Sequence, residues 1–128
     1  MSYPSIHRHL ENQGTTLETA SDAQLKRAFI EAFRSDLPLG FARVSELAEK
    51  LRSKQHRVML RLDPKSSEGQ EFARLLAPDI PRQVLEEHFD CAFGFYNCCS
   101  GIAAADKDSL KLTLREQIES QHPSFVDC

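Results

Sequence analysis

The sequence predicts a helix-rich α+β fold in a single domain, and three observations lead to that class. The chain has 128 residues, which is enough for one domain with a real core. Several segments carry apolar residues at helical spacing, whereas residues 58–62 alternate apolar and polar side chains as a half-buried strand does. The hydrophobic fraction of 41% and the charged fraction of 27% are ordinary for a soluble globular protein. We expect several helices around a central cysteine- and aromatic-rich helix, with at most one short two-stranded sheet; an all-α fold is the alternative.

The first part of the chain predicts a short arm and then a strong helix. We divide the chain into an N-terminal arm over 1–20, a globular domain over 21–122 and a C-terminal tail over 123–128. In the arm, Pro4 and Gly14 predict the start and end of a helical turn. A helix over Asp22–Arg34 follows, because Ser21 and Gln24 have capping-box spacing. Its predicted core-facing stripe consists of Leu25, Ala28, Phe29, Ala32 and Phe33.

The middle of the chain predicts two more helices separated by a strand. Residues Phe41–Ser53 carry an apolar helical face. Period-2 alternation then predicts a strand over Val58–Leu62, which Asp63 and Pro64 end. A third helix is expected over Glu68–Ala77, with Ser67 and Gln70 as its capping box.

The segment Pro81–Ser100 is predicted to be the central buried helix. It contains three of the four cysteines, and its apolar side chains go nearly all the way round a helix. Whether its aromatic part, Phe89–Tyr96, is solid core or lines a pocket stays open. Residues Leu110–Leu114 fit either a helix or a strand. If they form a strand, it is the natural partner of Val58–Leu62, because an isolated strand leaves its backbone groups unpaired.

Charge is unevenly distributed along a chain whose formal net charge is −3. The segment from Arg43 to Arg61 holds six basic residues and only two acidic ones, so it predicts a contact surface for a charged partner. The leading hypothesis is a small non-enzymatic protein, such as an adaptor, inhibitor or regulatory subunit, that binds another protein through this basic face. A homodimer is an open alternative, and no cofactor is expected. The predicted binding residues are Arg43, Lys50, Arg52, Lys54, Arg57 and Arg61.

The same basic residues support a second hypothesis, a DNA-binding regulator. Residues Ala42–Leu62 resemble a helix-turn-helix, in which Lys54–Leu62 would form the recognition helix. This resemblance implies that the basic side chains reach phosphates or base edges of DNA. Arg52 occupies the position where the motif usually has glycine, and the strand pattern explains the apolar spacing equally well.

A third hypothesis is a metal or thiol site around His88 and Cys91. Their i,i+3 spacing on a helix permits a shared ion, whereas Cys91 and Cys98 would lie about 10.5 Å apart along the axis. No Cys-x-x-Cys pair is present, so no metal site is predicted and these two residues are only weak candidates. The usual catalytic boxes are missing, which leans against an enzyme without deciding the question.

The sequence also predicts a compartment. No signal peptide and no apolar run of about 18 residues occur, so a cytoplasmic protein with reduced cysteines and no membrane partner is expected.

Overall fold

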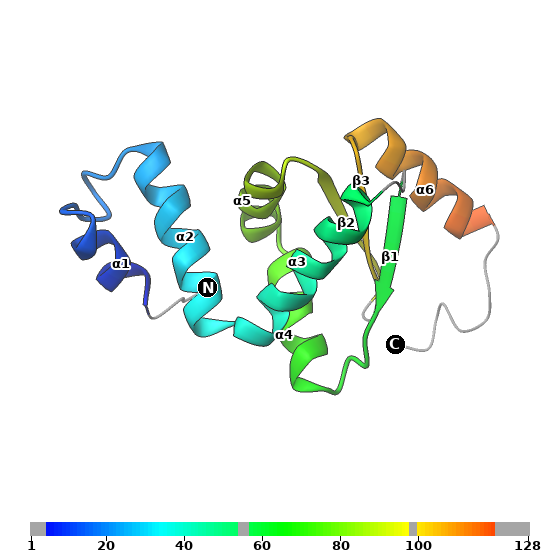
Figure 1. Ribbon diagram of the computed structural model, residues 1–128, viewed down its shortest axis with the longest axis horizontal. Coiled ribbons are helices and arrows are strands. Elements are labelled where there is room, and N and C mark those ends of the chain that lie inside the picture. Colours follow the sequence, from blue (N-terminus) through cyan, green and yellow to red (C-terminus); the bar gives the residue numbers. More distant parts are fainter. Residues whose placement is uncertain (1–4, 54–56, 98–99, 120–128) are drawn as a thin grey trace.

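The fold is α+β and helix-rich, as predicted. The computed structural model describes residues 5–53, 57–97 and 100–119. Within these residues the chain forms six helices and one three-stranded antiparallel sheet (Figure 1). The elements are α1 (Ile6–Asn12), α2 (Asp22–Asp36), α3 (Pro38–Arg52), β1 (Arg57–Arg61), α4 (Ser67–Leu76), α5 (Asp79–Phe89), β2 (Ala92–Asn97), β3 (Ser100–Ala104) and α6 (Lys107–Glu119).

Helix α2 begins at the predicted capping box. The Gln24 amide donates to Ser21 Oγ at 3.2 Å, and the Ser21 amide donates to Gln24 Oε1 at 2.9 Å, so each residue satisfies an unpaired N–H of the other. Most of the predicted stripe is buried, with Ala28, Ala32 and Phe33 fully covered. The helix therefore forms where its sequence predicts it.

Helix α3 begins three residues earlier than expected, at Pro38. Proline is preformed for the first helical turn, and the early start gives free backbone amides a partner. The amides of Leu39 and Gly40 both donate to Glu71 Oε1, at 2.9 and 3.0 Å. Helix α4 in turn is capped by Ser66, whose hydroxyl accepts from Gly69, rather than by Ser67.

The predicted central helix over Pro81–Ser100 is wrong. Helix α5 ends at Phe89, because Asp90 adopts a left-handed conformation with φ 54° and ψ 54° that turns the chain into β2. Phe93 packs on one face of the sheet and Ala92 on the other. A strand covered on both faces has a continuous apolar run, which sequence pattern alone does not separate from a buried helix.

The sheet has three strands instead of at most two. Its order is β1-β3-β2 with both pairs antiparallel, so Ala104 lies opposite Arg57 on one side and Ala92 on the other. The partner of β1 is therefore β3, whereas Leu110–Leu114 belongs to α6. All five residues of β3 are buried, and the four other than Ile102 have small side chains, which let helices approach both faces. A run of mostly small residues has no strong strand pattern, so the sequence did not predict this central strand.

The helix-turn-helix interpretation is also corrected by the structure. Residues 57–61 of the expected recognition helix form β1, with Val58 buried and Arg57, Met59 and Arg61 exposed. Residues 54–56 lie outside the described residues. The alternation of inward and outward side chains, together with the ladder to β3, accounts for the strand.

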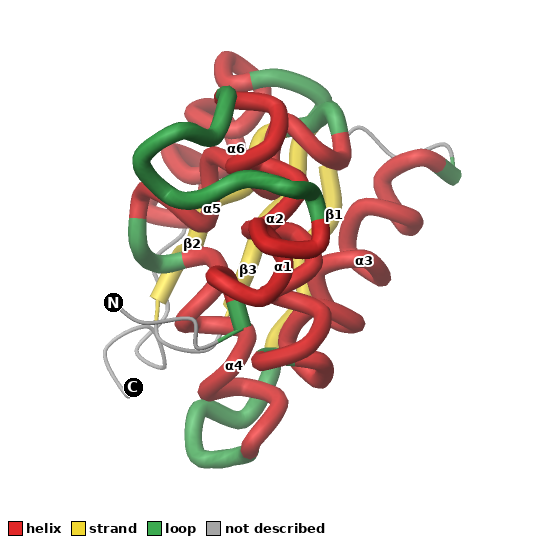
Figure 2. Tube along the Cα trace, turned by 90° about the vertical axis from the view of Figure 1, so that its left-hand side faces the viewer, coloured by secondary structure: helices red, strands yellow, loops and turns green. Residues whose placement is uncertain are grey.

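The sheet is covered by helices on both faces. Helices α3, α4 and α5 share the large core with Val58, Phe93 and Ala103, whereas Leu110 of α6 packs with Ile102 on the opposite face. Figure 2 shows β1 and β2 at the two edges of the sheet, with α3 extending past the β1 edge. Helices α1 and α2 form a hairpin that contacts the rest of the molecule mainly through α3 and α5 (Figure 1). Among the described helices, none has the length and apolar character needed to span a membrane.

Candidate functional site

The structure places five of the six predicted basic residues, and it separates them into different environments. Arg43 is held between helices: its Nε donates to Glu68 Oε2 at 3.0 Å, and its Nη1 donates to Glu46 Oε2 at 3.2 Å. These carboxylates raise the pKa of the Arg43 guanidinium above its ordinary value, first through hydrogen bonds and then through their charge. Arg43 thus ties α3 to the first turn of α4.

Arg52 is directed toward the end of α5. Its Nη1 donates to Glu49 at 2.8 Å, and its Nη2 donates to the carbonyl of Phe89 at 3.4 Å. Phe89 is the last residue of α5, and the negative end of a helix dipole stabilises a cation placed there. Lys54 lies outside the described residues. Arg43 and Arg52 therefore serve contacts between helices.

Of the remaining three cations, Arg57 and Arg61 belong to β1 itself, and Lys50 lies in α3, the helix that precedes this strand. Lys50 is exposed in the last turn of α3, and Arg57 and Arg61 are exposed at the two ends of β1. Arg57 forms an ion pair with Glu116 of α6, in which both side chains are nearly half exposed. Between the two arginines, on the same side of the strand, Met59 is 39% exposed, which is high for a large apolar side chain. We call Lys50, Arg57, Met59 and Arg61 the β1 patch.

The two edge strands of the sheet differ in whether a neighbouring side chain binds their backbone. At the β2 edge, the amide of Phe93 donates to Glu86 Oε2 at 2.9 Å, and the Glu86 side chain is only 12% exposed. At the β1 edge, no hydrogen bond from the described residues outside the sheet reaches a backbone group of 57–61. An edge strand with unpaired N–H and C=O groups is a template for another strand. The arginines were predicted from the sequence, but no sequence pattern predicts this difference between the edges.

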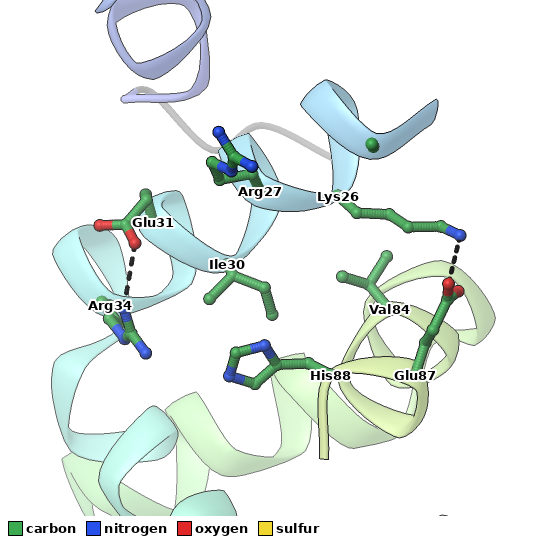
Figure 3. Close-up of a pocket in the computed structure, with 9 residues that line it drawn as sticks. Lys26, Arg27, Ile30, Glu31, Arg34, Val84, Glu87 and His88 are labelled. Atoms are coloured by element: carbon green, nitrogen blue, oxygen red, sulfur yellow. Dashed lines mark hydrogen bonds and ion pairs between the residues drawn. The ribbon is translucent and has the colours of Figure 1, made fainter. Parts of the chain in front are cut away.

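A second feature, which the sequence analysis missed, is a cleft between α2 and α5. Its volume is about 380 Å³, within the range of ligand sites, although it opens widely to solvent. Figure 3 shows the ion pair between Lys26 and Glu87 bridging the two helices, with Ile30 and Val84 between them. The spacing of Val84, Glu87 and His88 at i, i+3 and i+4 was the available signal. The residues that line the cleft are Ala23, Lys26, Arg27, Ile30, Glu31, Arg34, Val84, Glu87 and His88.

His88 faces this cleft beside an aromatic cluster. Its ring lies 4.7 Å from that of Phe89 and 6.5 Å from that of Phe41, over which Arg34 is placed at 5.1 Å. Burial, followed by the charges of Arg34 and Arg52, lowers the pKa of His88 below its ordinary value of 6.5, and Glu31 opposes the shift. Neutral His88 is thus the form that the folded protein favours.

The lowered pKa of His88 predicts a specific loss of stability in acid. The folded state disfavours protonated His88, so its contribution is present above about pH 6.5 and is lost as the pH falls below it. Between about pH 7.5 and pH 5, the free energy of unfolding should fall more steeply for the parent protein than for His88→Gln. Urea unfolding at several pH values measures this difference, and equal slopes would contradict the assignment.

Cys91 is a free thiol in an environment that opposes its ionisation. Burial and then the nearby Glu86 carboxylate raise its pKa from 9.0 to about 11, while Arg52 acts in the opposite direction. The thiolate is the nucleophile and the metal ligand, so this environment suits neither role. Among the described residues, no three His, Cys, Asp or Glu side chains gather closely enough to hold a metal.

Slow alkylation of Cys91 is the corresponding prediction. A rise of two pKa units reduces the thiolate fraction near neutral pH by about 100-fold. In a variant with Cys98→Ser, Cys99→Ser and Cys128→Ser, iodoacetamide should therefore react with the folded protein about 100-fold more slowly than with the urea-unfolded protein. Equal rates would show that the folded structure does not protect this thiol.

The fold and its basic edge strand define the molecule as a helix-rich α+β domain with a candidate contact surface at β1. Comparison with known proteins adds a family. A model of the family KH_NucS_shadow, described as NucS shadow ORF, matches residues 9–128, and the chain belongs to this family. No curated protein and no solved structure matches the chain.

Proposed function

We propose that this chain is a non-enzymatic binding protein that recognises an acidic surface of another protein through Lys50, Arg57 and Arg61. The observation that carries the proposal is the position of Arg57 and Arg61 at the two ends of an exposed edge strand, with Lys50 exposed in the preceding helix, apart from the arginines that tie helices together. The chain as a whole has a formal charge of −3, so attraction of an acidic partner depends on this local field. Complementary charge of this kind gives specificity and a faster association rate.

Nucleic acid is the other acidic macromolecule to consider, because the family name contains KH. KH is the name of a module that clamps four backbone nucleotides with a GXXG loop. No two of the five glycines here, at positions 14, 40, 69, 94 and 101, are three residues apart, so the sequence has no GXXG. The absence of a GXXG loop, and the finding that residues 57–61 form a strand instead of a recognition helix, favour a protein partner over nucleic acid.

A binding assay with matched charge variants tests the proposal. Fluorescein-labelled poly-glutamate is titrated with the parent, with Lys50→Glu/Arg57→Glu/Arg61→Glu, and with Lys111→Glu/Arg8→Glu/Arg74→Glu. The two triple variants have the same composition and charge, but the second set places its changes on α6, α1 and α4, where all three cations are exposed. Fluorescence anisotropy at increasing salt is the readout.

We expect the β1 triple variant to bind at least tenfold more weakly than the parent, and the control triple variant to bind within about threefold of the parent. Circular dichroism establishes that all three proteins are folded. Equal losses in both variants would overturn the proposal, because binding would then follow net charge alone. Binding of an RNA or DNA oligonucleotide but not of poly-glutamate would also overturn it.

A further inference from the structure

We infer that β1 is a strand-addition site, at which an extended acidic segment of a partner protein pairs with the free edge of the sheet. This inference rests on the proposed function and adds the way in which the partner is held. Carboxylates of the segment lie opposite Arg57 and Arg61, and an apolar residue lies opposite Met59.

The backbone supplies the first argument. In the strand order β1-β3-β2, β1 has a neighbour on one side only, and the described residues outside the sheet leave its outer N–H and C=O groups without partners. The β2 edge is different, because Glu86 accepts the hydrogen bond of the Phe93 amide. Strand addition uses such open edges, with main-chain hydrogen bonds for affinity and alternate side chains for specificity.

The side chains supply the second argument. Arg57, Met59 and Arg61 project from alternate positions on one side of β1, with the pattern positive, apolar, positive. Residues directly opposite each other on paired strands have Cβ atoms about 5 Å apart, close enough for opposite charges to attract. The complementary segment therefore has the pattern acidic, x, apolar, x, acidic.

The same pattern disfavours a second copy of this chain as the occupant. Antiparallel pairing of two β1 strands centred on Met59 would place Arg57 of each copy opposite Arg61 of the other. Like charges directly opposite on paired strands are destabilising. The edge thus selects an acidic partner over itself.

Glu116 of α6 is the residue that an incoming carboxylate replaces. It pairs with Arg57 while both side chains remain 42–47% exposed, so the pair is a weak surface contact. Helix α3, which carries Lys50 in its last turn, extends past the same edge (Figure 2) but packs on the other face of the sheet, with Val58. An acidic segment added at β1 therefore meets Arg57 and Arg61 directly, while Lys50 contributes through its charge at longer range.

Two peptides of equal composition test this arrangement. The first has Glu-Thr-Val-Thr-Glu at its centre, and the second has Thr-Glu-Val-Glu-Thr. The first reads the same in both directions, so it places a carboxylate opposite each arginine in either strand orientation. The second can match only one arginine at a time. We expect the first to bind at least tenfold more tightly by fluorescence anisotropy.

Backbone methylation and one variant complete the test. N-methylation of one alternate set of residues in the first peptide should abolish binding, while methylation of the other set, whose N–H groups point away from β1, should leave it intact. Glu116→Gln should increase affinity for the first peptide several-fold by releasing Arg57. If both methylated peptides bind alike, or if the two sequences bind equally, strand addition is wrong while the proposed function stands. If poly-glutamate itself does not bind, both are wrong.

Discussion

The variant Arg57→Glu/Arg61→Glu is expected to lose about 100-fold in affinity for the peptide centred on Glu-Thr-Val-Thr-Glu. Each substitution replaces an attractive pair by a repulsive one at an exposed edge, where a like-charge contact costs about 1.4 kcal/mol or more, and each 1.4 kcal/mol is a factor of ten. The loss should shrink as salt rises, because exposed charges are screened beyond about 10 Å at 0.1 M salt.

The decisive control is a charge swap. The same double variant should bind the matching peptide centred on Lys-Thr-Val-Thr-Lys more tightly than the parent protein does. Recovery with the basic peptide would show that the variant is folded and that the carboxylates act opposite residues 57 and 61. If the variant binds neither peptide although its circular dichroism is unchanged, paired charges at β1 do not explain recognition.

A large effect on stability is expected from Gly101→Ala in the central strand. A Cβ at this position would lie 2.4 Å from Cζ of Phe72 and 3.1 Å from Cδ1 of Leu76, on the face of the sheet that α4 covers. Phe72 is fully buried, so its ring has little room to move. Overpacking of this kind costs about 3 kcal/mol, a large part of the stability of a small domain.

A matched substitution on the opposite face should be mild. A Cβ at Gly94 would lie 3.1 Å from Cδ1 of Leu110, the end of a flexible side chain. Gly94→Ala should therefore change the free energy of unfolding by less than about 1 kcal/mol, because added backbone stiffness offsets the crowding. Urea unfolding of both variants, and of Gly101→Ala/Phe72→Leu, measures the contrast. We expect the added Phe72→Leu to recover much of the loss, and equal costs at Gly94 and Gly101 would contradict the packing.

Local sequence signals predicted α2, α3, α4 and the first strand well. Ser21 and Gln24 located the start of α2 because a capping box is a short-range interaction. The alternation over Val58–Leu62 located β1, which the structure has at Arg57–Arg61, for the same reason. The start of α3 was missed by three residues, because Glu71, which lies more than 30 residues away, caps its N-terminus.

The sheet was less predictable because long-range packing determines it. Residues 92–96 are apolar and four of the five residues at 100–104 are small, so neither segment shows the alternation of a half-buried strand. The left-handed Asp90 that separates α5 from β2 has no distinctive sequence signal. The candidate site was likewise predictable only where local sequence determines it. Its arginines were visible in the sequence, whereas the open β1 edge and the Glu86 contact at β2 depend on the assembled sheet.

The most direct test of strand addition is an NMR measurement of contacts between isotope-labelled protein and the unlabelled peptide centred on Glu-Thr-Val-Thr-Glu. Intermolecular nuclear Overhauser effects report protons that lie within about 5 Å, the separation of residues on neighbouring strands. Binding at the proposed edge predicts cross-strand contacts from the backbone of Arg57–Arg61 to the peptide backbone, and none from β2. Contacts confined to the cleft between α2 and α5, or to side chains without any backbone contact at β1, would contradict it.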